Sequence, residues 1–269
     1  METAIERQLK AKPNRRIFNT CVGILVVVII LWSGSVIDPQ NIKQNGLQIA
    51  QNIVLGILRP DTTSMFNFTM QGIPYLMLET VCIAFLGTIV GAILAIPFAF
   101  LSAANIVPRP LTFLGHFAVM AIRTVPPIIY GLMFIRVTGP GPFAGLLTMS
   151  FCSIGMVSKM YTEAIEELDP RIIESLTAMG CNAFEKIRYG ILPQLTPIFL
   201  SIVIYRFDMN LRDAAVLGLV GAGGIGAPLI FAMNGYRWND VGAILIWLIV
   251  VVLIIEFVST KIRVKLVQG

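Results

Sequence analysis

Charged residues are scarce in this chain: Asp, Glu, Lys and Arg make up 13% of its 269 residues, against about 25% in a soluble domain. Histidine occurs once, at His116, and no nucleophile is clustered with a general base, so the sequence offers no recognisable catalytic site. The four cysteines have no C-x-x-C or metal-ligand spacing, which argues against zinc and thioredoxin-like sites. A Walker A motif is also missing. We therefore expect a protein that is not an enzyme and binds no metal or cofactor.

Long apolar runs make up much of the sequence. Hydrophobic residues make up 56% of the chain, and runs of about 18 or more recur, each long enough to cross a bilayer as a helix. The sequence therefore predicts an all-α membrane protein with six transmembrane helices. The first run lacks the short apolar core and the cleavage site of a signal peptide, so we expect it to be retained. The spans are expected at 17–37, 73–101, 111–138, 142–158, 194–218 and 240–259.

Basic residues outside these spans are unevenly distributed. With six spans, thirteen lysines and arginines fall on the side of the two termini and the loop 159–193, and three fall on the other side. The positive-inside rule places the richer side in the cytoplasm, so both termini and this loop are expected there. Basic loops also explain the net charge of +5, and we expect no nucleic-acid partner.

Three parts of the chain follow from this topology. Residues 1–71 would hold an N-terminal cytoplasmic tail, the first span and an external interfacial helix, because apolar residues between Leu47 and Leu58 recur at helical spacing opposite glutamines. Residues 72–260 would form the main transmembrane domain, and 261–269 a cytoplasmic tail.

The loop 159–193 is polar but has the start and stop signals of two short helices. Such a loop could pack on its own protein or dock on a cytoplasmic partner, and local sequence alone leaves both open. The signals are an N-cap at Asp169 before Pro170, a stop at Gly180, a capping box of Asn182 with Glu185, and the entry to the next span at Pro193.

The fifth span carries four charges, each of which costs about 2.5–3.5 kcal/mol at mid-bilayer. Asp208 and Arg212 are spaced i,i+4, acid first, and Arg206 and Asp213 lie two turns apart on another face. The charges could hold helices together or line the path of an anion, and the two roles are compatible. Arg123 in the third span is a further lone cation. We take all five as candidates for a translocation path, with Arg206 and Arg123 foremost because guanidinium matches oxyanion geometry.

A glycine cluster follows the fifth span. Gly221, Gly223 and Gly226 spell G-x-G-x-x-G, but a dinucleotide site needs a strand before the motif, and here a membrane helix precedes it. With Gly224, these residues would instead permit tight turns at the outer mouth, as a gate, and their amides could cradle an oxyanion.

Several tracts resemble one protein family, the inner-membrane permease subunits of binding-protein-dependent ABC importers. These carry a cytoplasmic E-A-A-x3-G-x9-I-x-L-P motif, which this chain matches at four fixed points and departs from at three. The matches are Glu174, Gly180, Leu192 and Pro193; Ser175 and Leu176 replace the alanines, and Gly190 replaces the isoleucine. Tracts such as R-T-V-P-P (123–127), Y-R-F-D-M-N-L-R (205–212) and V-L-G-L-V-G-A-G-G-I-G (216–226) are similar to the phosphonate branch.

This resemblance, over about 72–260, implies a type I ABC importer permease bundle, the MetI-like fold, in a bacterial inner membrane. It implies a homodimer, two cytoplasmic subunits that bind ATP and Mg, and an extracytoplasmic substrate-binding lipoprotein. The cargo would be phosphonate, phosphite or phosphate. The ATPase would contact the loop at Asp169, Glu174, Ala178, Gly180, Leu192 and Pro193. The alternative is an autonomous proton-coupled secondary transporter or a channel for a small anion.

Overall fold

The computed structural model describes residues 16–35 and 46–268, and no strand occurs among them. The chain divides into two compact units, residues 1–51 and 52–269. In the first unit, α2 (Arg16–Ser35) is a helix of 20 residues, and its side chains from Phe18 to Gly34 are all exposed. An apolar helix exposed on every side is typical of a segment surrounded by lipid. The helix expected around Leu47–Leu58 is present as α3 (Gly46–Leu58), and its place at the membrane interface stays a prediction.

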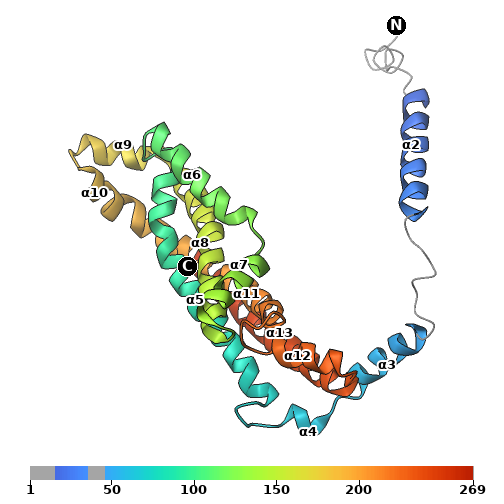
Figure 1. Ribbon diagram of the computed structural model, residues 1–269. Coiled ribbons are helices and arrows are strands. Elements are labelled where there is room, and N and C mark those ends of the chain that lie inside the picture. The colour runs from blue at the N-terminus through green and yellow to red at the C-terminus, as the bar shows by residue number, and fades with distance from the viewer. Residues whose placement is uncertain (1–15, 36–45, 269) are drawn as a thin grey trace. The chain divides into compact units, whose positions relative to one another are not determined.

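The second unit is a bundle of helices (Figure 1). α9 and α10 lie at one end of it, and α4 and α12 lie at the opposite end. Its elements are α4 (Thr62–Met65), α5 (Ile73–Ser102), α6 (Arg109–Thr124), α7 (Pro127–Thr138), α8 (Pro142–Glu166), α9 (Pro170–Ala178), α10 (Ala183–Glu185), the π-helical turn η2 (Lys186–Ile191), α11 (Leu192–Gly218), α12 (Gly226–Asn234) and α13 (Trp238–Gln268).

Close packing of α5 on α8 forms the centre of this unit. Gly87 of α5 lies against Met149 of α8, and a Cβ added at Gly91 would stand 2.5 Å from Cβ of Ser153. Small residues let helix backbones approach in this way inside membranes. The G-x-x-x-G of α5 is therefore used within the chain.

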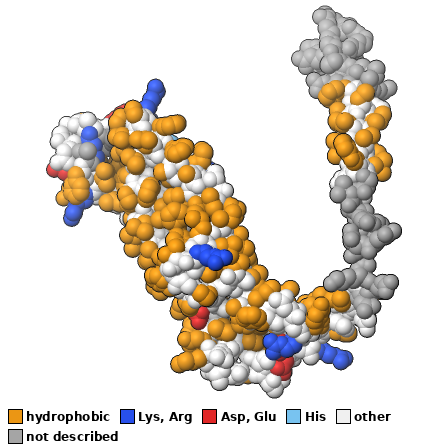
Figure 2. All heavy atoms as spheres, in the orientation of Figure 1, with side chains coloured by type: hydrophobic (Ala, Val, Ile, Leu, Met, Phe, Trp, Pro, Cys, Tyr) orange, Lys and Arg blue, Asp and Glu red, His pale blue; other side chains and the backbone are white. Residues whose placement is uncertain are grey.

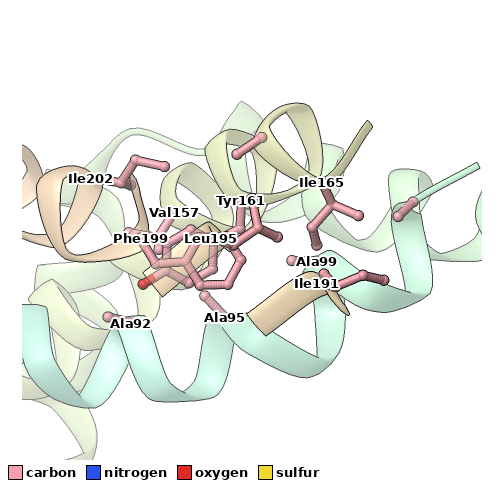
Figure 3. Packing of buried hydrophobic residues seen from close by; sticks show 12 residues of the cluster. Ala92, Ala95, Ala99, Val157, Tyr161, Ile165, Ile191, Leu195, Phe199 and Ile202 are labelled. Atoms are coloured by element: carbon pink, nitrogen blue, oxygen red, sulfur yellow. The ribbon is translucent and has the colours of Figure 1, made fainter. Parts of the chain in front are cut away.

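A buried apolar cluster joins α5, α8 and α11 near the end that carries α9. The rings of Tyr161 and Phe199 stack with centroids 3.9 Å apart, and Leu195 and Ala95 are fully buried beside them (Figure 3). Because Tyr161 and Ile165 belong to this cluster, α8 extends to Glu166. The end of the fourth span predicted at residue 158 was therefore too early: polar residues on the exposed face of this helix hid its buried face.

Within residues 16–35 and 46–268, four helices qualify as membrane spans by length and composition, and a fifth does if the bent pair α6–α7 counts as one span. The bend is 84° and falls at Pro126, because the residue before a proline is driven out of helical geometry. Pro97 lies inside α5 without interrupting it. The first predicted span, 17–37, corresponds to α2, whose apolar stretch Phe18–Gly34 is shorter than the helices that qualify.

The second half of the predicted loop differs from expectation. Instead of a separate helix before the fifth span, α10 leads through η2 into α11, and Lys186–Gly218 runs as one span of 33 residues. Pro193 stands in the first turn of α11, where its missing N–H requires no break.

Figure 2 shows apolar side chains over most of the visible face of the second unit, with several basic and acidic groups near its ends.

Candidate functional site

The charged turns of α11 form two ion pairs of different quality. Arg212 donates a hydrogen bond to Oδ2 of Asp208, which confirms the i,i+4 pair expected from the sequence. Arg206 Nη2 lies 4.0 Å from Oδ2 of Asp213, which is the outer limit for an ion pair. Arg206 is buried, with 5% of its surface exposed, whereas the side chain of Asp213 is 41% exposed.

A buried polar network surrounds Arg206 and was not foreseen from the sequence. Nδ2 of Asn210 donates to Oγ1 of Thr88 (2.8 Å) and to Oγ of Ser153 (2.7 Å), and Nε of Arg206 donates to the same Ser153 oxygen (3.3 Å). The network joins α5, α8 and α11, and all three small polar residues are essentially without exposure. Buried polar groups of this kind are favourable only when they are hydrogen-bonded, so they fix the place of Arg206. The sequence signal that could have indicated this network is the presence of polar residues inside otherwise apolar spans.

Arg206 and Arg123 line one cavity of about 200 Å³. Its other lining residues are Ile122, Val125, Pro127, Cys152 and Met156. Arg123 reaches this cavity from the last turn of α6, directly before the bend. The structure thus brings together the two foremost path candidates, whereas Asp208, Arg212 and Asp213 are not among the residues that line this cavity.

Arg123 also lines a second cavity, of about 350 Å³, between α6 and α8. This cavity has mixed charge, because Lys159, Glu163 and Glu166 line it together with His116. Lys159 and Glu163 form a salt bridge of 3.3 Å. Arg123 therefore stands between a mixed-charge cavity and the cavity that it shares with Arg206.

The loop around α9 has the local structure that the sequence predicts. Asp169 accepts a hydrogen bond from the Arg171 amide (3.0 Å) as N-cap. Gly180 has a φ of +82°; its amide donates to the Thr177 carbonyl (3.0 Å), and the next amide, of Cys181, donates to the Leu176 carbonyl (3.0 Å), as in a Schellman motif. The reciprocal bonds of Asn182 and Glu185 (2.8 and 2.9 Å) complete the predicted capping box.

One face of α9 packs on η2 and the rest is open. Leu176 and Ile172 lie against Gly190, where a Cβ would overlap Cδ1 of Leu176. All six residues predicted to touch a partner subunit are exposed: Asp169, Glu174, Ala178, Gly180, Leu192 and Pro193. Exposed apolar side chains accompany them, at Met179, Phe184 and Tyr189. Apolar groups gathered on a polar loop are typical of an interaction surface.

The glycine loop has the tight turns that were expected. Gly221, Gly223 and Gly224 have φ values of +95°, +82° and +74°, which side chains with a Cβ rarely adopt. The Gly224 amide donates to Glu79 Oε1 (2.8 Å), and the next amide donates to Thr80 Oγ1 (2.9 Å). Because these two amides donate to α5, they are not available to bind an oxyanion in the way that the sequence suggested. The role of the glycine loop as a gate stays a prediction. Gly226, which completes the motif, begins the unforeseen helix α12.

A third cavity, of about 580 Å³, lies beside this loop and is lined by Glu79, Arg237 and Asp240 among others. Ser64 also lines it and donates hydrogen bonds to Asp61, the N-cap of α4. Hydrogen bonds from the hydroxyls of Ser64 and Thr63 and from their amides lower the pKa of Asp61 to about 2, so this cap is ionised at neutral pH.

Residues 95–267, more than half of the chain, match the family described as "Binding-protein-dependent transport system inner membrane component". The chain belongs to this family. It is a multi-pass membrane permease component of a transport system, which favours the importer over the autonomous secondary transporter.

Relatives and solved structures agree with this assignment. A putative phosphite transport system permease protein, HtxC of Stutzerimonas stutzeri, is 31% identical over 93% of this chain and 87% of its own length. The phosphite transport system permease protein PtxC of the same organism is 29% identical over 93% and 89%. A chain of the MetNI methionine ABC transporter is 22% identical, with a TM-score of 0.65 over 75% of this chain and 99% of that one. The last likeness confirms the MetI-like permease fold.

Proposed function

We propose that this chain is the permease of an ATP-driven importer for a phosphorus oxyanion, namely phosphite, phosphonate or phosphate. The observation that carries the proposal is the cavity that Arg123 and Arg206 line together, because two guanidinium groups in a membrane domain favour an anionic cargo. The relatives support it, since the most similar of those reported above are named as phosphite transport permeases.

The assembly that we propose has two copies of this chain, two cytoplasmic ATP-binding subunits and an extracytoplasmic binding protein. ATP and Mg would bind at the partner subunits, and the exposed surface of α9 with Met179 and Phe184 would dock on them. The binding protein would deliver the oxyanion at the end of the unit that carries α4 and α12. The anion would then pass the Arg206–Arg123 cavity towards the cavity lined by Lys159 and Glu163. The docking loop would act on the path through α11, with which it is continuous.

Uptake by the reconstituted complex tests this function. With the binding protein and ATP present, vesicles should accumulate labelled phosphite, methylphosphonate or phosphate, and should not accumulate sulfate. Arg206→Gln should lower uptake tenfold or more, because it removes charge-assisted hydrogen bonds worth about 1.5–3 kcal/mol to the anion. Arg136→Gln is the matched control, since Arg136 is an exposed arginine of α7 and lies outside the cavity shared by the two path arginines. Uptake driven by a proton gradient without ATP would instead establish a secondary transporter.

Orientation in the membrane is a separate expectation. We propose that both termini and the α9 loop face the cytoplasm, because thirteen basic residues fall on that side and three on the other. Reporter fusions after Gln40, Arg109, Asp169 and Trp238 should give signals outside, inside, inside and outside. An external signal at Asp169 would contradict the docking role of the loop.

A further inference from the structure

The two ion pairs on α11 provide an internal comparison. The Asp208–Arg212 pair is directly hydrogen-bonded. The Arg206–Asp213 pair is separated by 4.0 Å, whereas a charged hydrogen bond spans about 2.7–2.9 Å. Among the described residues, the Arg206 guanidinium makes one side-chain hydrogen bond, from Nε to Oγ of Ser153. A buried arginine is therefore left with a loose counter-ion.

The cavity beside Arg206 is positively charged. Arg123 and Arg206 are the ionised groups among its lining residues, the others being apolar side chains and Cys152. A volume of about 200 Å³ holds a small tetrahedral oxyanion together with several water molecules, since one water occupies about 30 Å³ in the liquid. Opposite charges attract more strongly in such surroundings than in bulk water. An anion is the ligand that this cavity fits.

Asp213 is placed to yield its position. Its side chain is 41% exposed, against 6% for Arg206, so fewer neighbouring groups of this chain hold the carboxylate in place. Arg206 cannot move in the same way, because Ser153 and Asn210 fix it between α5, α8 and α11.

We propose that Asp213 is an internal counter-ion of Arg206, which a tetrahedral oxyanion displaces when it binds in the cavity between Arg206 and Arg123. The identity of the oxyanion rests on the proposed function; the displacement does not. Asp213 keeps Arg206 from standing unpaired when the cavity is empty. The Asp213 carboxylate also competes with the transported anion for Arg206. This competition weakens the binding of the anion between the two arginines enough for it to be released.

Cys152 is a native reporter for this cavity, because it lines the cavity beside Arg206. The experiment uses the full-length chain in membrane vesicles with Cys152 as the single cysteine. Two methanethiosulfonate reagents of similar size are compared, one ending in an anionic sulfonate and one in a cationic trimethylammonium group. The same Cys152 thiolate attacks both reagents. The ratio of the two modification rates is therefore independent of the fraction of Cys152 that is ionised. The other cysteines, Cys21, Cys82 and Cys181, are changed to Ser.

The anionic reagent should modify Cys152 faster than the cationic one. Asp213→Asn should raise the ratio of the anionic to the cationic modification rate about fivefold or more, which is the lower end of typical coupling between two ligands. Arg206→Gln should bring this ratio near unity. Phosphite, methylphosphonate and phosphate should slow the modification. Asp213→Asn should lower the concentration that gives half protection, also about fivefold or more, because the competing carboxylate is gone.

Asp240→Asn is the matched control, since Asp240 pairs with Arg237 (3.2 Å) and does not line this cavity; it should leave both readouts unchanged. An Asp213→Asn variant with unchanged or weaker protection would overturn the proposal, and so would a Cys152 that neither reagent modifies. If Arg206→Gln does not fold, Arg123→Gln serves in its place.

The proposed function can fail separately. If no phosphorus oxyanion protects Cys152 but Asp213→Asn still raises the reagent ratio, the counter-ion stands and the cargo is wrong. If uptake is intact but Asp213→Asn has no effect, the function stands and the counter-ion is wrong.

Discussion

In a reconstituted complex that carries Gly180→Val, substrate should no longer stimulate ATP hydrolysis, and uptake should fall at least tenfold. Gly180 has a φ of +82°, and a left-handed conformation costs a residue with a Cβ roughly 1–2 kcal/mol, most for a β-branched one. The two hydrogen bonds that close α9 at the Thr177 and Leu176 carbonyls depend on this turn. Losing it reorients the helix that we expect to contact the ATPase.

The same position provides its own control. No described atom of this chain lies within 4 Å of a Cβ built at Gly180, so the first effect expected of Val on this chain is backbone strain. Gly180→Asn should therefore retain most coupling, because asparagine tolerates the left-handed region. The membrane helices should fold in both variants, which gel filtration in detergent checks. Normal stimulation in Gly180→Val would mean that the α9 loop packs only on its own protein.

Gly190→Ile should abolish coupling as well, and Leu176→Ala in the same chain should restore it. A side chain at Gly190 would overlap Leu176 Cδ1, and overpacking of this kind costs about 1–3 kcal/mol. These are two of the positions where the chain departs from the family motif: a large residue replaces the second alanine, and glycine replaces the isoleucine. We infer that the two departures compensate each other: the large side chain stands on α9, at Leu176, and the small residue stands opposite it in η2, at Gly190.

A double-mutant cycle measures this compensation. Substrate-stimulated ATP hydrolysis and thermal stability in detergent are compared for Leu176→Ala, Gly190→Ile and the pair, and the coupling energy should be about 1–3 kcal/mol in favour of the pair. Ala178→Ile is a matched control for added volume on the loop, since Ala178 is exposed, and Leu176→Ala should not rescue it. Additive effects at 176 and 190 would contradict the compensation.

Local features of the loop could be predicted because their hydrogen bonds span few residues. The cap at Asp169, the turn at Gly180 and the box of Asn182 with Glu185 each join groups at most five residues apart. The Asp208–Arg212 pair follows from helical spacing in the same way. The loop's orientation on η2 could not be predicted, since it depends on the fit of Leu176 to Gly190.

The site itself depends on contacts that are distant in the chain. Asn210 finds Thr88 122 residues away and Ser153 57 residues away, and the sequence does not show which helix faces will meet. Arg123 was a candidate from its charge alone, but only the 84° bend after α6 shows that it lines the same cavity as Arg206. The end of α8 was missed for a related reason, because Tyr161 and Ile165 show their role only when α11 packs on them.

The fusion of η2 with α11 makes a single lever of the loop and the charged segment. Gly190 and Arg206 are sixteen residues apart along it, or about 24 Å at 1.5 Å per residue. A tilt of about 5° around Gly190 would carry Arg206 roughly 2 Å sideways over that length, and α8 would have to move with it because Arg206 is hydrogen-bonded to Ser153. Arg123 belongs to a different helix, so the same tilt changes the width between the two arginines. Under the proposed function, a small movement of α9 would therefore be magnified into a change in how closely the two arginines hold the anion.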